Sequence, residues 1–180
     1  MPVTLRPAKF DDIPVLQQLI AQSVRGLSKG YYTPQQIESS IKYIFGVDTQ
    51  LVADGTYYVA GATHTIAACG GWSKRQTLYG GDQHKEAADL LLDPLTDAAR
   101  IRAFFVHPDW ARQGIGRMLI RLCEAEAIKN GFKQMELGAT LPGEPLYAAM
   151  GYKSISKVIA PMPDGEQLEI IKMSKQLTGL

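Results

Sequence analysis

Apolar residues recur along the chain with two different periods, and these periods predict the secondary structure. Short runs rich in β-branched and aromatic residues predict strands, whereas apolar positions spaced by three and four predict helices with one buried face. The predicted strands are Val3 to Arg6, Tyr57 to Ala60, Thr65 to Trp72, Ile101 to Val106, Lys133 to Leu137, Tyr152 to Ile159 and Leu168 to Met173. The predicted helices begin at Asp11 or Asp12, at Thr33, near Gly114 and at Pro142.

The order of these elements predicts a single mixed sheet. Short turns at 61–63 and at Asp164-Gly165 predict two antiparallel hairpins. The connection from Ile101–Val106 to Lys133–Leu137 runs through a helix, so these two strands are predicted to be parallel with a right-handed crossover. We therefore expect an α/β fold over residues 1–180 as one domain, antiparallel in its N-terminal part, with a parallel pair in the middle and helices on its faces.

One long polar stretch interrupts this pattern. Ser73 to Ala99 has no strand or helix periodicity, is rich in charged and polar residues and carries a glycine pair, Gly80-Gly81. Compact domains seldom keep a connection of this length without a use. It is predicted to be a lid over a binding site, to be partly disordered, or both.

Composition and charge narrow the class of partner. Nineteen basic and eighteen acidic residues leave a net charge of +1, which gives no support to a nucleic-acid partner or an anionic membrane surface. Met1 to Pro7 lack a signal-peptide pattern and no apolar run approaches a membrane span, so we expect a cytoplasmic protein. Cys69 and Cys123 are isolated, without metal-ligand spacing, and are predicted to be core thiols; no metal is expected.

The stretch from Ile101 to Arg121 carries the clearest chemical signal. Gly114 and Gly116 fall in the first turn of the predicted helix, where backbone amides lack partners and no side chain hinders an approaching anion. Arg112 and Arg117 add positive charge, which predicts a pyrophosphate guest. The other interpretation is that the glycines only allow the helix to pack closely on a strand.

Two other phosphate motifs compare poorly with the same residues. The Walker A motif requires Gly-Lys-Ser/Thr, but Gly116 is followed by Arg117 and Met118. The dinucleotide fingerprint requires a small residue where this chain has Leu119. Glu136 lies about 20 residues beyond Gly116, where that fingerprint places a ribose-binding carboxylate. A nicotinamide-dependent oxidoreductase therefore stays as an alternative.

Two segments resemble the Gcn5-related N-acetyltransferase (GNAT) superfamily: VHPDWARQGIGRMLI, from Val106, and PLYAAMGYKSI, from Pro145. The resemblance implies a GNAT-like fold whose sheet splays apart between the parallel strands to admit acetyl-CoA. It assigns Tyr147 as the catalytic acid. Two positions depart from the family pattern, Ala111 in place of Arg or Gln and Thr140 in place of a frequent Asn. The cofactor-binding residues that the resemblance implies are Phe105, Val106, Arg112, Gln113, Gly114, Ile115, Gly116, Arg117 and Thr140.

The resemblance further implies direct transfer of the acetyl group to a primary amine of a small molecule or peptide. A backbone amide near Phe105 would bind the oxyanion, and Tyr147 would protonate the departing thiolate. The sequence does not identify a general base, although His107 and Glu136 are titratable and close to strand ends.

The acceptor side of the site is less determined by the sequence. The resemblance places the first two helices beside the acceptor, so Tyr31 and Tyr32 are candidates for lining it. An acyl-CoA-binding module without turnover is the second hypothesis. The sequence leaves open whether two copies of the chain form a homodimer.

Overall fold

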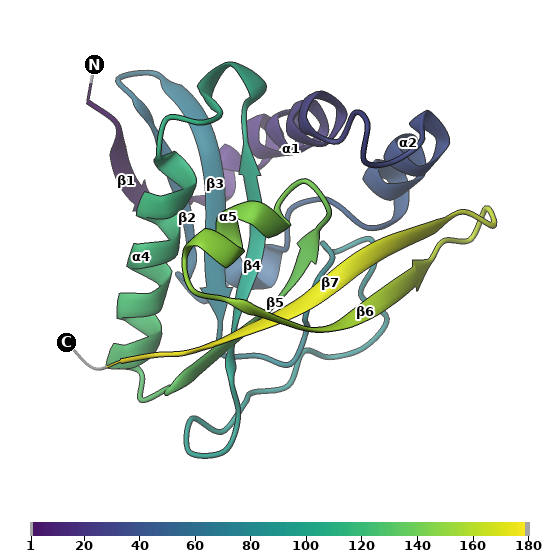
Figure 1. The fold of residues 1–180 in the computed structure, drawn as a ribbon. Coiled ribbons are helices and arrows are strands. Elements are labelled where there is room, and N and C mark those ends of the chain that lie inside the picture. The colour runs from purple at the N-terminus through teal and green to yellow at the C-terminus, as the bar shows by residue number, and fades with distance from the viewer. Residues whose placement is uncertain (1, 179–180) are drawn as a thin grey trace.

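The fold is built on one seven-stranded mixed sheet in the order β1-β2-β3-β4-β5-β7-β6 (Figure 1). The computed structural model describes residues 2–178. Among its strand pairs only β4 and β5 run parallel, so the predicted mixed sheet is confirmed. The strands are β1 (Thr4–Pro7), β2 (Tyr57–Ala62), β3 (Thr65–Ser73), β4 (Ala99–Val106), β5 (Gln134–Thr140), β6 (Lys153–Pro161) and β7 (Gln167–Gln176).

The helices largely follow the predicted pattern. Thr33 caps α2 as expected: its hydroxyl accepts a hydrogen bond from the Gln36 amide, and the Gln36 side chain accepts one from the Thr33 amide. Asp12 precedes α1 without a side-chain cap, because its carboxylate binds the Lys9 amide and Arg6 instead. The α-helices are α1 (Ile13–Leu27), α2 (Pro34–Tyr43), α3 (Thr49–Ala53), α4 (Ile115–Lys129) and α5 (Glu144–Ala149), with 3-10 turns at Phe10–Asp12 and Pro108–Trp110.

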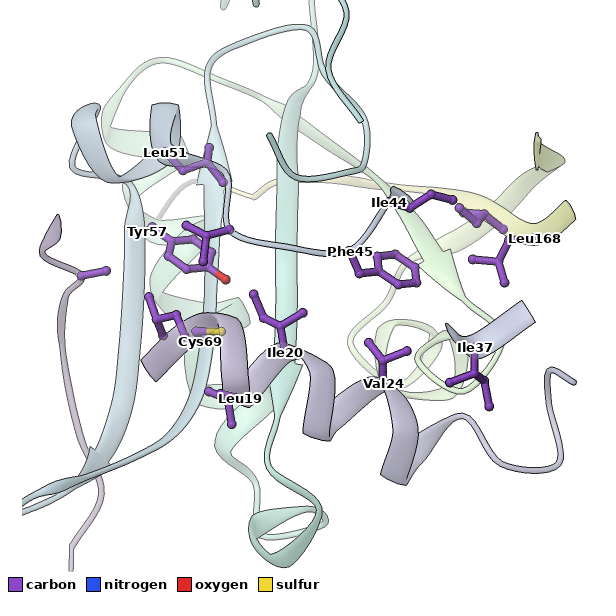
Figure 2. Packing of buried hydrophobic residues seen from close by; sticks show 14 of the residues in the cluster. Leu19, Ile20, Val24, Ile37, Ile44, Phe45, Leu51, Tyr57, Cys69 and Leu168 are labelled. Atoms are coloured by element: carbon purple, nitrogen blue, oxygen red, sulfur yellow. The ribbon is translucent and has the colours of Figure 1, made fainter. Parts of the chain in front are cut away.

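Two hydrophobic clusters cover the two faces of the sheet. The first packs α1 and α2 on the sheet and includes Leu19, Ile20 and Val24 of α1 (Figure 2). The second packs α4 on the opposite face through residues such as Leu119 and Ile120. The predicted core thiols are confirmed, since Cys69 lies in the first cluster and Cys123 in the second. Within residues 2–178 no helix has the length and apolar character needed to span a bilayer.

The parallel pair separates soon after it begins. Cα partners are found only at Ala99 with Met135 and at Arg100 with Glu136, so the rest of β4 and β5 diverge. β7 fills the far side of β5 along its whole length, which leaves the gap between β4 and β5 as the opening in the sheet.

A bulge lies in β4 where it borders this gap. The register with β3 passes from Arg102 opposite Gly71 to Phe105 opposite Cys69, so β4 contains one residue more than its partner. Ala103 has a φ of 54°, in the left-handed region, and its carbonyl accepts a hydrogen bond of 2.7 Å from the Tyr57 hydroxyl. The bulge turns successive side chains of β4 toward different parts of the gap.

Candidate active site

A cavity of about 750 Å³ passes through the sheet at the gap between β4 and β5. Its walls come from both hydrophobic clusters, with Val24 and Phe45 from the first and Ile115 and Leu137 from the second. It joins the N-terminal end of α4 to the C-terminal end of α1. A long guest can therefore lie with one end on each face of the sheet.

The structure brings together nearly all the residues that the sequence predicts for the site. Gln113 does not line the cavity, because its side chain turns back and donates a 3.3 Å hydrogen bond to the Asp109 carbonyl. The predicted residues that do line the cavity are Phe105, Val106, Arg112, Gly114, Ile115, Gly116, Arg117, Thr140 and Tyr147.

The N-terminus of α4 has the features of an anion cradle. Gly114 precedes the helix with a φ of 84°, a conformation that glycine adopts without strain, and no side chain caps the first amides. Arg112 also has a positive φ, 66°, so the loop turns sharply twice before the helix. A Cβ at Gly116 would come within 2.7 Å of Leu146 Cδ2. Gly116 therefore permits close packing of α5, and the binding of an anion by the glycine pair stays a prediction.

Charge in the cavity is confined to this end. Of the lining residues that the structure describes, only Arg112 and Arg117 are charged. The first turn of α4 contains no acidic residue. The helix dipole and both guanidinium groups therefore favour an anion of the size of a pyrophosphate.

Tyr147 lies where α5 meets the gap. Its ring packs on Phe104, with centroids 6.3 Å apart, and on Tyr152, with centroids 6.0 Å apart. The residue is only 8% exposed but lines the cavity. Burial raises the pKa of its hydroxyl well above the ordinary value, so Tyr147 stays protonated and can donate a hydrogen bond at neutral pH.

The sequence did not predict a role for Ser23. It lies on the buried face of α1, lines the cavity, and accepts a 3.2 Å hydrogen bond at Oγ from the Val106 amide. The Val106 N–H is thus bound to a side chain of α1 instead of to a neighbouring strand. A polar residue at a buried position of an amphipathic helix is the signal that could have identified it.

Neither candidate base lies in the cavity. His107 Nδ1 accepts a hydrogen bond from the Asp109 amide and caps the short turn after β4. The Glu136 carboxylate is 2.9 Å from Arg100 Nη1 and 3.5 Å from Lys172 Nζ. Both side chains are held by these contacts, and neither lines the cavity.

The two tyrosines predicted for the acceptor side have different places. Tyr31 lines the cavity and is 51% exposed. Tyr32 lies outside it: its hydroxyl donates to the Glu169 carbonyl and accepts from the Leu141 amide. Burial raises the pKa of Tyr32 to about 12. Tyr32 therefore joins the α1–α2 connection to β7 and to the end of β5.

The long polar stretch supplies an ordered wall of the cavity through residues 78–81. The Gly81 amide donates to the Ile44 carbonyl at 2.8 Å, and Arg75 and Leu91 form a β-bridge at the base of the loop. Arg102 Nη2 donates a 2.6 Å hydrogen bond to the Gly80 carbonyl. The sequence signal for this contact is an arginine within the apolar run of β4.

Comparisons with known proteins agree with this geometry. A family model described as an acetyltransferase (GNAT) domain matches residues 53–154, which is more than half of the chain. The match includes β4, the N-terminus of α4 and all of α5. Among curated proteins no sequence is similar enough to count as a match.

Solved structures share the fold at low sequence identity. A GCN5-related N-acetyltransferase from Rhodopseudomonas palustris has a TM-score of 0.73 and 20% identity, over 98% of this chain and 97% of that one. The PaiA N-acetyltransferase of Thermoplasma acidophilum, solved with coenzyme A, has a TM-score of 0.64 and 15% identity, over 98% and 99%. YncA of Salmonella typhimurium, a putative acetyltransferase solved with acetyl-CoA, also has a TM-score of 0.64 and 15% identity, over 100% of this chain and 96% of that one.

Proposed function

The chain belongs to the GNAT acetyltransferase family, and on that premise we propose that it moves the acetyl group of acetyl-CoA directly to a primary amine of a small molecule or peptide. The observation that carries the proposal is the cavity through the splayed sheet. It connects an anion cradle at α4 to Tyr147 and then to an apolar and aromatic wall beyond β4. A donor with a charged end and a reactive end requires this order of features.

In the proposed complex the cradle holds the pyrophosphate of the donor. The free amides after Gly114 and the side chains of Arg112 and Arg117 supply the donors and the charge. Arg112 follows Ala111 and lines the cavity, so in this proposal it takes the place of the polar Arg or Gln side chain that the family pattern has one residue earlier. Gly116 leaves the helix surface without a side chain at this point.

The gap between β4 and β5 is where the extended arm of the donor fits. Phe105 and Val106 lie along one side and Thr140 along the other. Amide groups of the arm can pair with strand edges that have no neighbouring strand, as an added β-strand does. The Val106 amide, which now meets Ser23, is the candidate donor for the oxyanion at the reacting carbonyl.

Tyr147 is the candidate acid. When the amine nitrogen attacks the thioester carbonyl, the C–S bond breaks and negative charge develops on sulfur. A hydroxyl held in a low-dielectric wall stabilises that charge by a hydrogen bond and supplies a proton. Tyr147 is protonated at neutral pH, as this role requires.

Two other hypotheses have less support. An acyl-CoA-binding module needs no space beyond the thioester, but this cavity continues to the end of α1 and to residues 78–81. A nicotinamide-dependent oxidoreductase relied on Glu136, whose carboxylate is engaged by Arg100 and Lys172 outside the cavity.

A two-part experiment tests the proposal. Thermal unfolding with acetyl-CoA, CoA and NAD identifies the ligand, because a ligand that binds only the native state raises the melting temperature. Release of free CoA is then followed with panels of amines, amino acids, polyamines and peptides. Stabilisation by acetyl-CoA with amine-dependent CoA release supports the proposal, stabilisation without release supports the binding module, and stabilisation by NAD alone contradicts both.

A further inference from the structure

The end of the cavity opposite the cradle is aromatic and aliphatic. It is formed by Leu27 at the end of α1, Tyr31 from the α1–α2 connection, Phe45 from the segment after α2, and Leu78 and Tyr79 from the loop wall. Phe45 also packs edge-to-face on Phe105 of β4, with centroids 5.8 Å apart. This acceptor wall, as we call these five side chains, adjoins the strand that borders the gap.

The acceptor wall offers no anionic side chain to pair with a cation. Among residues 2–178, those that line the cavity include no aspartate, glutamate, histidine or lysine. The two lining arginines carry the same charge as an ammonium group. Apart from them, the titratable groups in the lining are the phenols of Tyr31, Tyr79 and Tyr147, and burial raises the pKa of the last two.

The charged groups behind the wall are already engaged. Asp48 contacts both Arg102 and Lys85, and Lys85 also contacts Asp89. His84 packs on the outer side of the wall against Tyr79, with ring centroids 5.1 Å apart, and burial lowers the pKa of its imidazole. None of these four charged side chains lines the cavity, so none replaces a missing carboxylate.

An ammonium group that enters such a site loses its water without gaining a counter-ion, which favours the neutral amine. We infer that the acceptor is an apolar monoamine that enters as the free base, with an aromatic or branched substituent on the acceptor wall and no second positive charge. This inference rests on the proposed function, because it specifies the acceptor of the same reaction.

The chemistry balances without a protein base. The neutral nitrogen forms the new C–N bond, the C–S bond breaks, and the electron pair of that bond leaves on sulfur. The nitrogen then has one surplus proton and the thiolate lacks one, so one proton moves from nitrogen to sulfur, directly or through the Tyr147 hydroxyl. The products are a neutral amide and a thiol. The free amine thus brings the proton that the thiol needs, and a wall without carboxylate or imidazole is sufficient.

The test compares three acceptors that share a phenyl ring. 2-Phenylethylamine is an apolar monoamine, phenylalanine amide has an α-amino group, and 2-(4-aminomethylphenyl)ethylamine adds a second ammonium to the first. An alkylammonium has a pKa of about 10.4 and an α-ammonium about 7.7 to 8.0. We expect kcat/KM to rise with pH toward the pKa of each amine, so the two monoamine profiles are displaced by about 2.5 pH units. The dication should react with a kcat/KM at least about tenfold lower.

A substitution in the wall supplies a second readout. Leu78→Glu adds a carboxylate beside the acceptor, and we expect it to raise the ratio of kcat/KM for the dication over 2-phenylethylamine by about tenfold. Leu78→Gln has nearly the same shape without the charge and should leave that ratio unchanged. Stabilisation of each variant by acetyl-CoA shows that the donor site is intact.

The outcomes separate this inference from the proposed function. Profiles that break at one common pH for both monoamines would identify a protein base and overturn the inference, as would preference for the dication. Stabilisation by acetyl-CoA with transfer to none of the three amines also overturns it. Absence of both stabilisation and transfer would instead remove the proposed function.

Discussion

Arg102 Nη2 lies 2.9 Å from Asp48 Oδ2, and neither side chain is exposed to solvent. Asp48 is the residue that caps α3, and Arg102 lies next to the bulge of β4. The same guanidinium binds the Gly80 carbonyl, so a single buried side chain joins β4 to the loop wall of the cavity. Burial lowers the pKa of Arg102 from its ordinary value, against the attraction of Asp48.

We expect Arg102→Met to destabilise the fold by about 3 to 5 kcal/mol, because it removes the fully buried partner of a buried carboxylate. Lys85 still contacts Asp48, which places the expected loss near the lower end of that range. Urea denaturation followed by circular dichroism measures the free energy of unfolding.

Arg25→Met is the matched control. Arg25 forms an ion pair with Glu38 in which both side chains are more than half exposed. Exposed pairs contribute less than about 1 kcal/mol, so this variant should unfold near the wild-type urea concentration. Equal losses in the two variants would show that the buried Arg102–Asp48 pair contributes no more to the free energy of unfolding than an exposed pair.

A second prediction concerns pH and the base of the loop. Arg75 binds both oxygens of Asp54, at 2.7 and 3.0 Å, and this hydrogen bonding holds the pKa of Asp54 below 3.8. A carboxyl whose pKa is depressed in the folded state stabilises that state above the unfolded pKa, and the stabilisation is lost as the pH falls through the folded pKa. Asp54→Asn should therefore lower the free energy of unfolding by about 1 kcal/mol at pH 7 and by almost nothing at the lowest pH.

The measurement is the difference in unfolding free energy between wild type and variant across the acid range. Asp11→Asn, at an exposed position of the same charge type, is the control. A difference for Asp54→Asn that stays constant down to the lowest pH would mean that ionisation of Asp54 contributes nothing to it.

The periodic parts of the fold could be predicted because their signals are local. Thr33-Pro34 marks the start of α2, and the apolar run before His107 marks β4. The helix α3 was not predicted, since five residues are too few for a periodic pattern. The insertion of β7 between β5 and β6 was not predicted either, because strand order depends on contacts between distant segments.

The candidate site, too, has features that the sequence predicts and features that depend on distant contacts. The cradle at Gly114 and Gly116 depends on residues that are neighbours in sequence, so a motif captures it. Ser23 meets the Val106 amide only when α1 packs on β4, and no local pattern contains that contact. For Gln113 the motif does not reveal the side-chain position, since this side chain binds the Asp109 carbonyl and does not line the cavity.

A third prediction tests the cradle. Gly116→Glu should abolish the stabilisation by acetyl-CoA, because it places a negative charge where the pyrophosphate is proposed to bind. A saturating ligand at about 100 times its Kd stabilises the native state by about 2.7 kcal/mol, which gives a readily measured shift in melting temperature.

Gly116→Ala separates charge from packing in that experiment. Its Cβ meets the same Leu146 side chain but brings no charge, and the far end of a leucine can move aside. The alanine variant should keep most of the stabilisation by acetyl-CoA. Equal loss in both variants would assign Gly116 to the packing of α5 alone.

The last prediction is that Tyr147→Phe lowers turnover by about 10² to 10⁴ while acetyl-CoA affinity changes little. The substitution removes one oxygen and keeps the ring that packs on Phe104 and Tyr152. A thiol has a pKa of about 8.5 and a tyrosine about 10, so proton transfer to a fully formed thiolate is uphill by about 2 kcal/mol in water. Burial raises the pKa of Tyr147 further. The hydroxyl must therefore act mainly by a hydrogen bond that strengthens as charge develops on sulfur.

Tyr152→Phe is the matched control, since it removes the same atom from a neighbouring ring. The Tyr152 hydroxyl donates a 3.0 Å hydrogen bond to Glu124, and Tyr152 does not line the cavity. This variant removes one of two partners of Glu124, whose carboxylate keeps the ion pair with Lys175 Nζ at 2.9 Å, so it should lose about 1 kcal/mol of stability and keep its turnover within about threefold. Single-turnover measurements establish that chemistry limits the rate. If Tyr147→Phe then turns over as fast as wild type, Tyr147 contributes only packing, and water or another group protonates the sulfur.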